Sequence, residues 1–344
     1  MNMDEKLHFA DLSDQLLDWY ASAARDLPWR IGPQARARGV QPDPYRVWLA
    51  EIMLQQTTVP HATRYYLAFT QRWPTVVELA AAADEDVMAA WAGLGYYARA
   101  RNLLKCARAV TDLGAWPDTV EGLRKLPGIG PYTAGAVAAL AFGRRAAAVD
   151  GNVDRVFARL MALKGGWKLE KERLKTMVEA LVPEDRPAEF AEALMDLGAT
   201  ICTPKSPSCL LCPLASFCEG RREGAPERYP IKPKKAAKPH RQGHVFVEIG
   251  ADGSVRTERR PDRGLLGGMM GLPTSDWTEA AAAPKFPSQG NWQEIGEVRH
   301  VFTHFSLSLI VWRKETPGEM FPTPIESAAD GLPSVFAKAL KLVL

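Results

Sequence analysis

The sequence predicts a two-domain protein, in which an all-α domain precedes a smaller α/β domain. From Leu12 to about Ala199, apolar residues recur every three or four positions, which is typical of successive amphipathic helices. Beyond residue 244 the spacing changes to two, as in half-buried strands. The stretch PERYPIKPKKAAKPHRQ between them is rich in proline and lysine and predicts an extended linker. We therefore expect a helical domain over 1–222, a basic linker over 223–242 and an α/β domain over 243–344.

Within each domain, the expected elements follow from local breaks and turns. Prolines divide the helical region at Pro28, Pro74, Pro117, Pro127 and Pro183. In the second domain we expect a strand from His244 to Ile249 and a turn at Asp252 and Gly253. A strand from Arg299 to Trp312 and a helix over 334–342 follow.

Length and composition predict a globular protein with no membrane partner. The 344 residues include 47% hydrophobic and 24% charged side chains, enough for two cores. The first twenty residues are acidic and interrupted, unlike a secretion signal, and no run of eighteen apolar residues follows. We expect a cytoplasmic protein. In that compartment, clustered cysteines bind metal more often than they form disulfides.

The net charge of +3 is too small to indicate a nucleic-acid partner. Its distribution is uneven, because residues 219–243 hold eight Lys/Arg and three Glu, a net of +5. A solvated linker explains this segment most simply, and attraction to phosphates is a second interpretation.

Four of the five cysteines lie within seventeen residues, spaced C-x6-C-x2-C-x5-C. Four thiolates in one loop suit a [4Fe-4S] cluster or zinc, and zinc sites usually use two close pairs, whereas here only one pair is close. We therefore predict an iron–sulfur cluster, with four ordinary reduced thiols as the alternative. Cys106 stands apart in a helical stretch and is expected in the core. The predicted ligands are Cys202, Cys209, Cys212 and Cys218.

The segment LPGIGPYTAG, from Leu126 to Gly135, predicts a hairpin between two helices. Gly128 and Gly130 are able to adopt positive φ, and Pro131 suits the first turn of the next helix. The exposed N–H groups of such a hairpin can hold a DNA phosphate. A helix–turn–helix with no ligand is an equally good interpretation of the geometry.

Three polar residues stand beside apolar helical patterns. Asp150 and Asn152 open a helix, where both can serve simply as caps. Glu51 and Gln55 share one face of a helix whose other face is apolar. From residue physics alone, Glu51 would be an ordinary solvated glutamate.

Together these motifs resemble the endonuclease III superfamily of DNA glycosylases, defined by a helix-hairpin-helix, a glycine/proline-rich loop and a downstream aspartate. LPGIGPYTAG, VDGNVDRV and the cysteine loop occur in the family's order and spacing. WLAEIMLQQT, GLGYYARARN and LPWR narrow the resemblance to its adenine-specific, MutY-type branch. The likeness runs from about Trp19 to Cys218, interrupted by a longer segment at 31–43.

The resemblance implies removal of adenine by two carboxyl groups, as in glycoside hydrolysis. Glu51 would be the general acid that protonates the base, with its pKa raised by its apolar neighbours Trp48, Ile52 and Met53. Asp150 would stay ionised and stabilise the positive sugar, and Asn152 would orient water or Asp150. Strand-cutting members carry a lysine where this chain has Tyr132, so little or no lyase activity is expected.

It also implies double-stranded DNA as the partner, with adenine opposite 8-oxoguanine or guanine. We expect the protein to act as a monomer and, if it is bacterial, to be associated with the nucleoid. The adenine must be flipped from the duplex, and Gln56 and Tyr96 would fill the gap while Arg99 and Arg101 meet phosphates. The positions that match the family's adenine pocket are Arg25, Leu27, Trp29, Arg30 and Glu192.

The second domain is similar to the MutT-like, Nudix-type domain of these glycosylases, which reads oxidised guanine. Phe302, Thr303 and His304 match the reading loop, although the family usually has serine at the middle position. Alternatively, Thr303 and His304 are alternating residues of one antiparallel strand. No glutamate-dense helix follows residue 244, so we expect no pyrophosphate hydrolysis.

Two other functions would account for part of the sequence. A strand-cutting glycosylase of the endonuclease III type is opposed by Tyr132 and by the second domain. A non-catalytic iron–sulfur protein that binds DNA or senses redox state would require Glu51 and Asp150 to be incidental.

Overall fold

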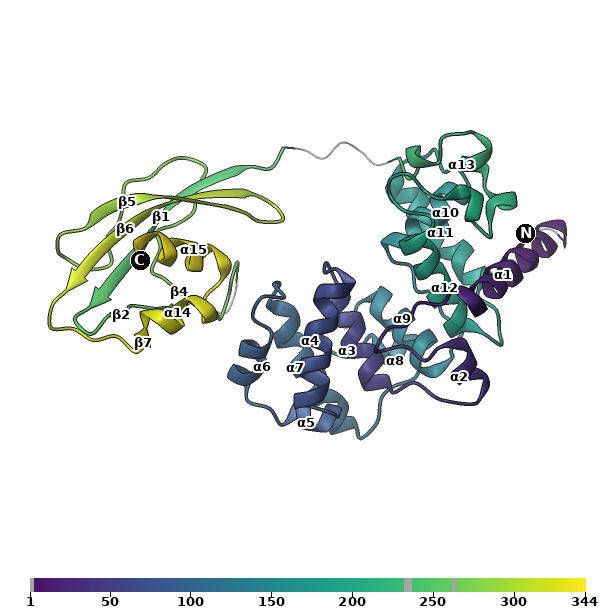
Figure 1. Cartoon of the computed structure of the whole chain (residues 1–344), viewed down its shortest axis with the longest axis horizontal. Helices are drawn as coiled ribbons and strands as arrows, with labels where there is room; N and C mark the ends of the chain where they lie inside the picture. The colour runs from purple at the N-terminus through teal and green to yellow at the C-terminus, as the bar shows by residue number, and fades with distance from the viewer. Residues whose placement is uncertain (1–2, 232–236, 262–263) are drawn as a thin grey trace. The chain divides into compact units, whose positions relative to one another are not determined.

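The computed structural model describes residues 3–231, 237–261 and 264–344. Their contacts divide the chain into two compact units (Figure 1). The first comprises Met1–Ala90 and Arg99–Lys234, and the second Trp91–Ala98 and Lys235–Leu344. Within the described ranges, no helix combines the length and apolar character needed to cross a lipid bilayer.

The first unit is built from helices, as predicted. All five prolines expected to divide the region lie between helices. Five helices, α2, α3, α4, α9 and α12, begin with a proline near their first position, where its missing N–H costs no hydrogen bond. The helices are α1 (Met3–Ala23), α2 (Pro33–Ala37), α3 (Pro44–Leu54), α4 (Val59–Arg72), α5 (Val76–Ala80), α6 (Asp84–Ala90), α7 (Ala98–Leu113), α8 (Val120–Leu123), α9 (Pro131–Phe142), α10 (Gly151–Leu160), α11 (Trp167–Leu181), α12 (Pro187–Thr200) and α13 (Glu219–Arg222).

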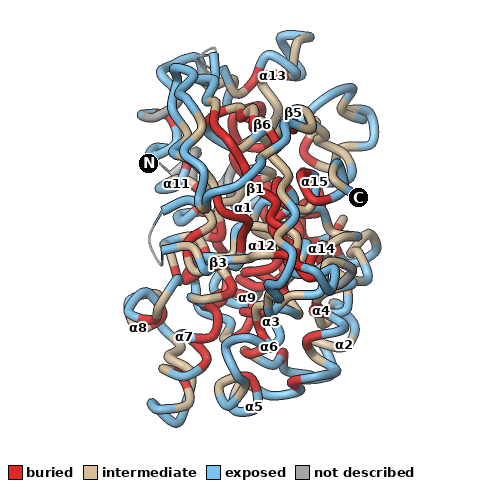
Figure 2. Tube along the Cα trace, turned by 90° about the vertical axis from the view of Figure 1, so that its left-hand side faces the viewer, coloured by how far each residue is buried: buried red, intermediate tan, exposed pale blue. Residues whose placement is uncertain are grey.

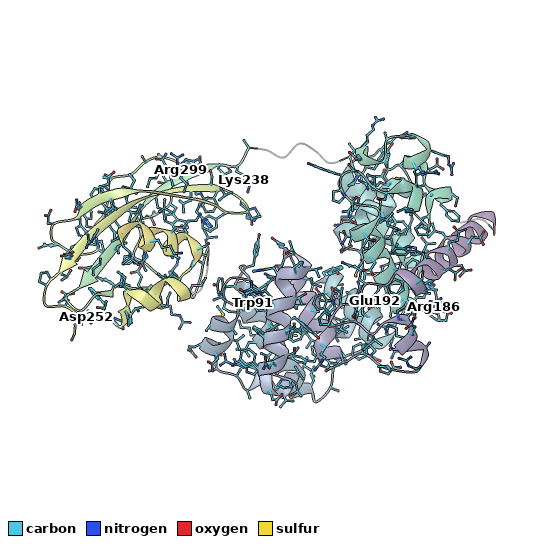
Figure 3. All side chains as sticks on the ribbon, viewed as in Figure 1. Trp91, Arg186, Glu192, Lys238, Asp252 and Arg299 are labelled. Carbon is cyan, nitrogen blue, oxygen red and sulfur yellow. The ribbon has the colours of Figure 1, made fainter. Side chains whose placement is uncertain are left out.

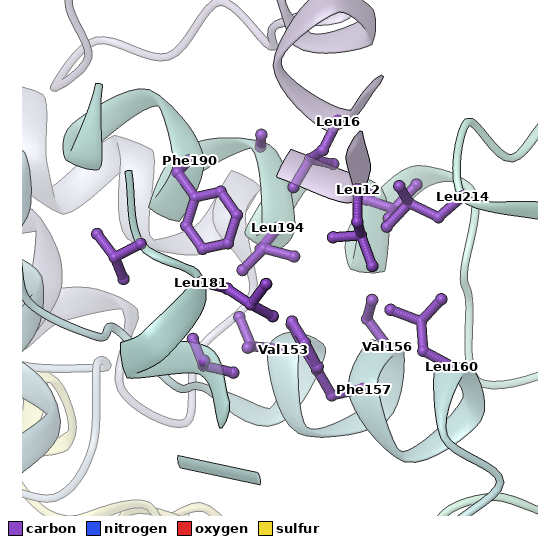
Figure 4. Packing of buried hydrophobic residues seen from close by; sticks show 14 of the residues in the cluster. Leu12, Leu16, Val153, Val156, Phe157, Leu160, Leu181, Phe190, Leu194 and Leu214 are labelled. Carbon is purple, nitrogen blue, oxygen red and sulfur yellow. The ribbon is translucent and has the colours of Figure 1, made fainter. Parts of the chain in front are cut away.

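Helices α1, α10, α11 and α12 enclose an apolar core (Figure 4). Leu16, Phe157 and Leu194 lie at its centre and are 0%, 1% and 1% exposed. A second buried layer contains α3 and α9, which are buried on nearly all sides (Figure 2). Gly135 of α9 permits close packing, because a Cβ there would lie 2.3 Å from the carbonyl oxygen of Ala147.

The end of the first unit includes residues that we expected in the linker. The chain forms short 3-10 turns, η1 (Cys209–Leu211), η2 (Ala215–Phe217) and η3 (Pro226–Arg228). Tyr229 is only 2% exposed, and its carbonyl oxygen accepts a hydrogen bond of 3.3 Å from Arg159 Nε. Residues 223–229 therefore belong to the first unit rather than to the expected linker 223–242, and 232–236 lies outside the described residues.

The second unit contains a five-stranded sheet in the order β5-β6-β1-β2-β7, with helices packed on one face (Figure 1). Strand β1 pairs in parallel with β6 and begins at His240, inside the expected linker. Alternate residues of β1 and β6 meet the C-terminal helix in a common core that includes Val245, Leu309 and Phe336. The elements are β1 (His240–Gly250), β2 (Ser254–Val255), β3 (Glu258–Arg259), β4 (Met270–Gly271), β5 (Gln293–Val301), β6 (Ser306–Thr316), β7 (Thr323–Pro324), α14 (Ile325–Gly331) and α15 (Ser334–Val343).

The prediction of one strand from Arg299 to Trp312 was wrong. The chain turns back after Val301, so β5 and β6 form an antiparallel hairpin. The Phe302 N–H donates to the Phe305 carbonyl at 2.9 Å, and the two rings pack 4.9 Å apart. The turn contains no glycine, proline or asparagine. The packing of the two phenylalanine rings holds it closed instead. The turn at Asp252 and Gly253 and the C-terminal helix are confirmed.

Candidate active site

A cavity of about 320 Å³ in the first unit collects residues from distant parts of the sequence. Ten of the predicted site residues line it, drawn from α3, α9, α10, α12 and the loop after α1. They are Arg25, Leu27, Trp29, Arg30, Glu51, Gln56, Tyr132, Asp150, Asn152 and Glu192. The cavity has further lining residues for which no role was predicted, namely Val47, Leu54, Gln55, Thr57, Val59, Leu140, Gly151 and Met195.

Glu51 is a buried acid, 5% exposed, rather than the solvated helix residue that its sequence neighbours suggest. Loss of hydration raises its pKa to about 7, and the charge of Asp150 adds to this effect. The hydrogen bond from Tyr132 opposes the shift. Trp48, Ile52 and Met53 are buried as expected, but the apolar residues of α3 that line the cavity beside Glu51 are Val47 and Leu54. Glu51 therefore holds its proton close to neutral pH.

Tyr132 lies in the first turn of α9, where the hairpin delivers it to the cavity. Its hydroxyl donates a hydrogen bond of 2.8 Å to Glu51 Oε2. Burial and the neighbouring carboxylates raise the pKa of Tyr132 well above its usual value, so the phenol stays neutral. Because Oε2 is occupied as an acceptor, Glu51 Oε1 is the atom left to carry and donate the acid's proton.

Asp150 is the N-cap of α10 and receives three hydrogen bonds. Its Oδ1 accepts from the backbone N–H groups of Asn152 and Val153 at 2.9 and 2.8 Å. Its Oδ2 accepts from Asn152 Nδ2 at 2.8 Å. Burial raises the pKa of Asp150, whereas these donors and the helix N-terminus favour the carboxylate. Of the two acids, Asp150 thus has the surroundings that suit a negative charge.

The amide of Asn152 is fixed on both sides. Its nitrogen donates to Asp150, and its Oδ1 accepts from Arg155 Nη2 at 2.8 Å. The same guanidinium donates to the Gly198 carbonyl at 2.6 Å. Asn152 therefore orients Asp150, one of the two roles considered for it from sequence.

Glu192 of α12 (Figure 3) lines the cavity together with Arg25 and Arg30 of the loop after α1, and these residues form a charged cluster. Glu192 Oε2 accepts from the Tyr20 hydroxyl at 2.8 Å, and its Oε1 lies 3.8 Å from Arg30 Nε. Asp196, one turn along, is fully buried and accepts from Arg25 Nε at 2.6 Å and Arg30 Nη1 at 2.7 Å. Sequence reasoning missed Tyr20 and Asp196, although two acids four apart in the apolar run FAEALMD were a usable signal.

Two residues predicted to wedge into DNA have strained backbones. Gln56 and Tyr96 have φ of 57° and 51°, a region that side chains other than glycine rarely adopt. Both are exposed. Arg99 differs from its predicted role at a phosphate, because its Nη1 donates to the carbonyls of Ile52 and Gln55 at 2.9 and 2.7 Å and caps the end of α3.

The hairpin between α8 and α9 has the predicted shape, with Leu126 and Ile129 buried as anchors. Gly128 has φ of 75°, and a Cβ there would lie 2.7 Å from the Cβ of Asn102. Gly130 has φ of −85° and open space around it, so it does not use the positive φ that we expected. Gly130 is instead the uncapped N-cap of α9, which leaves the helix N-terminus open to an anion.

The four clustered cysteines line one apolar pocket together with Arg159 and Pro207. Arg159 Nη1 lies 3.3 Å from Cys202 Sγ, which supplies positive charge beside the thiolates. Among the described residues, no group of three or more His, Cys, Asp or Glu is arranged to hold a metal ion, while all four cysteines share this one pocket. Four thiols converging on one apolar, positively lined pocket fit an iron–sulfur cluster.

In the second unit, the residues that were predicted to read oxidised guanine lie in the turn of the β5–β6 hairpin and not along one strand. Phe302 is held by stacking on Trp277, with ring centres 5.9 Å apart. Thr303 and His304 are exposed at the tip. The alternative that they alternate along one strand was therefore wrong, and both side chains are accessible from solvent.

Family models match both units. Residues 49–183 match the HhH-GPD superfamily of base excision DNA repair proteins, and 202–218 match the iron–sulfur binding domain of endonuclease III. Residues 244–342 match a NUDIX domain. The iron–sulfur match begins and ends at predicted ligand cysteines and supports a [4Fe-4S] cluster as the cofactor.

Curated relatives and solved structures are consistent with these family matches. The chain is 33% identical to the human adenine DNA glycosylase over 92% of its length and 68% of that protein. It is 38% identical to that of Mycobacterium tuberculosis, over 72% of this chain and 76% of the relative. A thermostable thymine-DNA glycosylase structure is 29% identical with a TM-score of 0.55, covering 64% of this chain and 98% of that one. An endonuclease III trapped as a covalent intermediate with DNA shares the fold, at 23% identity and a TM-score of 0.52.

These matches, together with the buried acid pair, account for both units of the chain. The chain belongs to the adenine DNA glycosylase family of base excision repair enzymes, with an iron–sulfur domain and a C-terminal NUDIX domain.

Proposed function

We propose that this glycosylase removes adenine paired with 8-oxoguanine or guanine by hydrolysis, with little or no strand cleavage, and acts as a monomer. The observation that carries the proposal is the pair of acids in one cavity, of which Glu51 has a pKa of about 7 and Asp150 is held by three N–H donors.

In the first step, Glu51 protonates a ring nitrogen of the extruded adenine. Its proton is on Oε1, since Oε2 accepts from Tyr132. The bond between the base and C1′ of deoxyribose then breaks, and its electron pair leaves with the protonated, neutral base. A pKa near 7 suits this task, because the acid is protonated and yet releases its proton readily.

In the second step, the Asp150 carboxylate stabilises the positive charge that develops on the sugar. Asn152 holds that carboxylate in place through its Nδ2. A water molecule then adds to C1′ and releases a proton. This proton restores the acid form of Glu51, so that atoms and charge balance.

Adenine recognition is assigned to the charged wall and its aromatic neighbour. Glu192 and Arg30 offer an acceptor and a donor inside the cavity, and Trp29 offers a ring for contact with the purine. Gln56 and Tyr96, exposed and with left-handed backbones, would fill the gap that the flipped nucleotide leaves. Gly128 and Gly130 would hold the DNA backbone through the hairpin.

Strand cleavage by a Schiff base requires an amine, and Tyr132 is a phenol bound to Glu51. Among the described residues that line the cavity, none is a lysine. This composition supports base removal without lyase activity.

The exposed turn of the second unit and the cysteine loop of the first have proposed roles as well. Thr303 and His304 would contact the oxidised guanine, since both are exposed on a turn that Phe302 anchors. Cys202, Cys209, Cys212 and Cys218 would be the cluster's four ligands, and the cluster would hold the C-terminal loop of the helical unit together.

The test uses duplexes with adenine opposite 8-oxoguanine, opposite guanine or opposite thymine, with strand breaks scored before and after hot alkali. We expect breaks only after alkali, and only in the first two duplexes. Breaks before alkali would contradict the monofunctional reaction. Unchanged activity of Glu51→Gln and Asp150→Asn would instead favour an incidental role for the acids.

A further inference from the structure

Arg36 is a charged residue of the longer segment 31–43 that reaches the active-site wall. Its Nη2 lies 3.4 Å from Glu192 Oε1 and 3.5 Å from the carbonyl oxygen of Leu140. Both Glu192 and Leu140 line the active-site cavity. The guanidinium is only 16% exposed, so this contact is substantially shielded from solvent.

The segment around Arg36 is folded so that the side chain points inward. Arg36 Nε donates to the Ile31 carbonyl at 3.0 Å, which fixes the plane of the guanidinium. The Gly39 N–H donates to the Arg36 carbonyl at 2.8 Å, and Gly39 turns the chain with φ of 83°. The short helix α2 thus presents one ordered cation to Glu192.

The two oxygens of Glu192 have different partners. Oε2 is fully engaged by the Tyr20 hydroxyl at 2.8 Å. Oε1 has longer contacts, 3.4 Å to Arg36 and 3.8 Å to Arg30. Oε1 therefore retains acceptor capacity for a donor in the cavity. Burial raises the pKa of Glu192, and the charges of Arg30 and Arg36 oppose this shift.

Arg36 also separates two cavities. It lines a second cavity of about 610 Å³, together with Pro33, Ala37 and Val40 of its own segment. Since it also contacts the wall of the active-site cavity, its side chain stands between the two spaces.

We propose that Arg36 is a positioning residue for base specificity: it holds the Glu192 carboxyl group in place, with Oε1 ready to accept a hydrogen bond from the exocyclic amino group of adenine. This inference rests on the proposed role of Glu192 in base recognition. Arg36 touches neither the base nor the sugar, and acts only through Glu192.

The test compares single-turnover excision of adenine with excision of unsubstituted purine, which lacks the amino group, in otherwise identical duplexes. Arg36→Met keeps the aliphatic stem without the charge. We expect it to slow adenine excision by about tenfold, the loss expected when one charge-assisted hydrogen bond is weakened, and to leave purine excision nearly unchanged. Arg36→Lys should restore most of the adenine rate. Arg38→Ala, at an exposed position of the same segment, is the matched control and should leave both rates unchanged.

Glu192→Gln separates this inference from the function on which it rests. We expect the same selective loss on adenine in that variant. A selective loss in Glu192→Gln with equal losses on both bases in Arg36→Met overturns the role of Arg36 alone. A non-selective effect of Glu192→Gln overturns the assignment of Glu192, and the inference with it.

Discussion

Glu51 and Asp150 line the same cavity, but their hydrogen bonds differ in kind. Glu51 accepts one hydrogen bond from a neutral phenol, whereas Asp150 accepts three from N–H groups at a helix N-terminus. Burial raises the pKa of both acids, and the additional donors favour charge on Asp150. When the pair holds a single proton, that proton belongs on Glu51.

Replacing Glu51 by Gln removes the acid while keeping an acceptor for Tyr132. We expect the single-turnover rate of adenine excision to fall about 10²- to 10⁴-fold, the usual contribution of a general acid. DNA affinity, measured by fluorescence anisotropy, should be nearly unchanged. A variant with full activity would remove Glu51 from the mechanism.

The same substitution should stabilise the folded protein at alkaline pH. The folded-state pKa of Glu51, about 7, lies above its ordinary value of 4.5. The folded form therefore retains a proton that the unfolded chain releases, and stability falls as pH rises from about 4.5 to about 7. The shift corresponds to roughly 3 kcal/mol above pH 7. Thermal unfolding should give Glu51→Gln a higher Tm than the parent at pH 8, with the difference shrinking toward pH 5.

The pH dependence of excision follows from the same group. Below a pH of about 7 Glu51 is protonated and able to donate, and above it the acid form declines. We expect the single-turnover rate to fall tenfold per pH unit on the alkaline side. In Tyr132→Phe, the hydrogen bond that lowers the pKa of Glu51 is absent, so the alkaline limb should move to higher pH. A shift to lower pH would show that another group titrates.

At the scale of helices and loops, two glycines of the hairpin between α8 and α9 are expected to differ in their effects, one on stability and the other on DNA binding. Gly128→Ala forces a Cβ at positive φ against Asn102, and should lower stability by about 1–3 kcal/mol. Gly130→Ala meets nothing within 4 Å and should leave the Tm unchanged. If the hairpin holds a phosphate, Gly130→Ala should still weaken DNA binding by crowding the N-terminus of α9. Unchanged affinity in Gly130→Ala would favour a hairpin without a ligand.

The cavity shows which site residues can be predicted from the sequence alone and which cannot. The ten predicted residues that share the cavity were found through motifs, because local spacing and family pattern coincide there. Asp196 and Arg36 were missed because their roles arise from contacts of α12 with the loop after α1 and with α2, which no local pattern encodes. Arg99 was assigned to DNA from its charge, although it caps α3.

The β5–β6 hairpin was misread for a related reason. Residues 299–312 alternate as a continuous strand would, and the turn contains none of the usual turn residues. Its closure depends on Phe302 packing against Trp277 and Phe305, which are a tertiary and a local partner. Burial of aromatic rings outweighed strand propensity at this point.

The proposed function uses residues of both units. The helical unit carries the cavity with the acid pair, and the second unit carries the exposed turn with Thr303 and His304. We expect Thr303→Ala with His304→Ala to reduce the preference for 8-oxoguanine over guanine opposite adenine by about tenfold, the value of one or two polar contacts. Excision of adenine opposite guanine should change little, because the acids are untouched. Ser308→Ala, a partly buried hydroxyl in β6 of the same hairpin, serves as a control. Equal slowing of both duplexes would mean that the turn contributes general DNA affinity rather than recognition of the oxidised base.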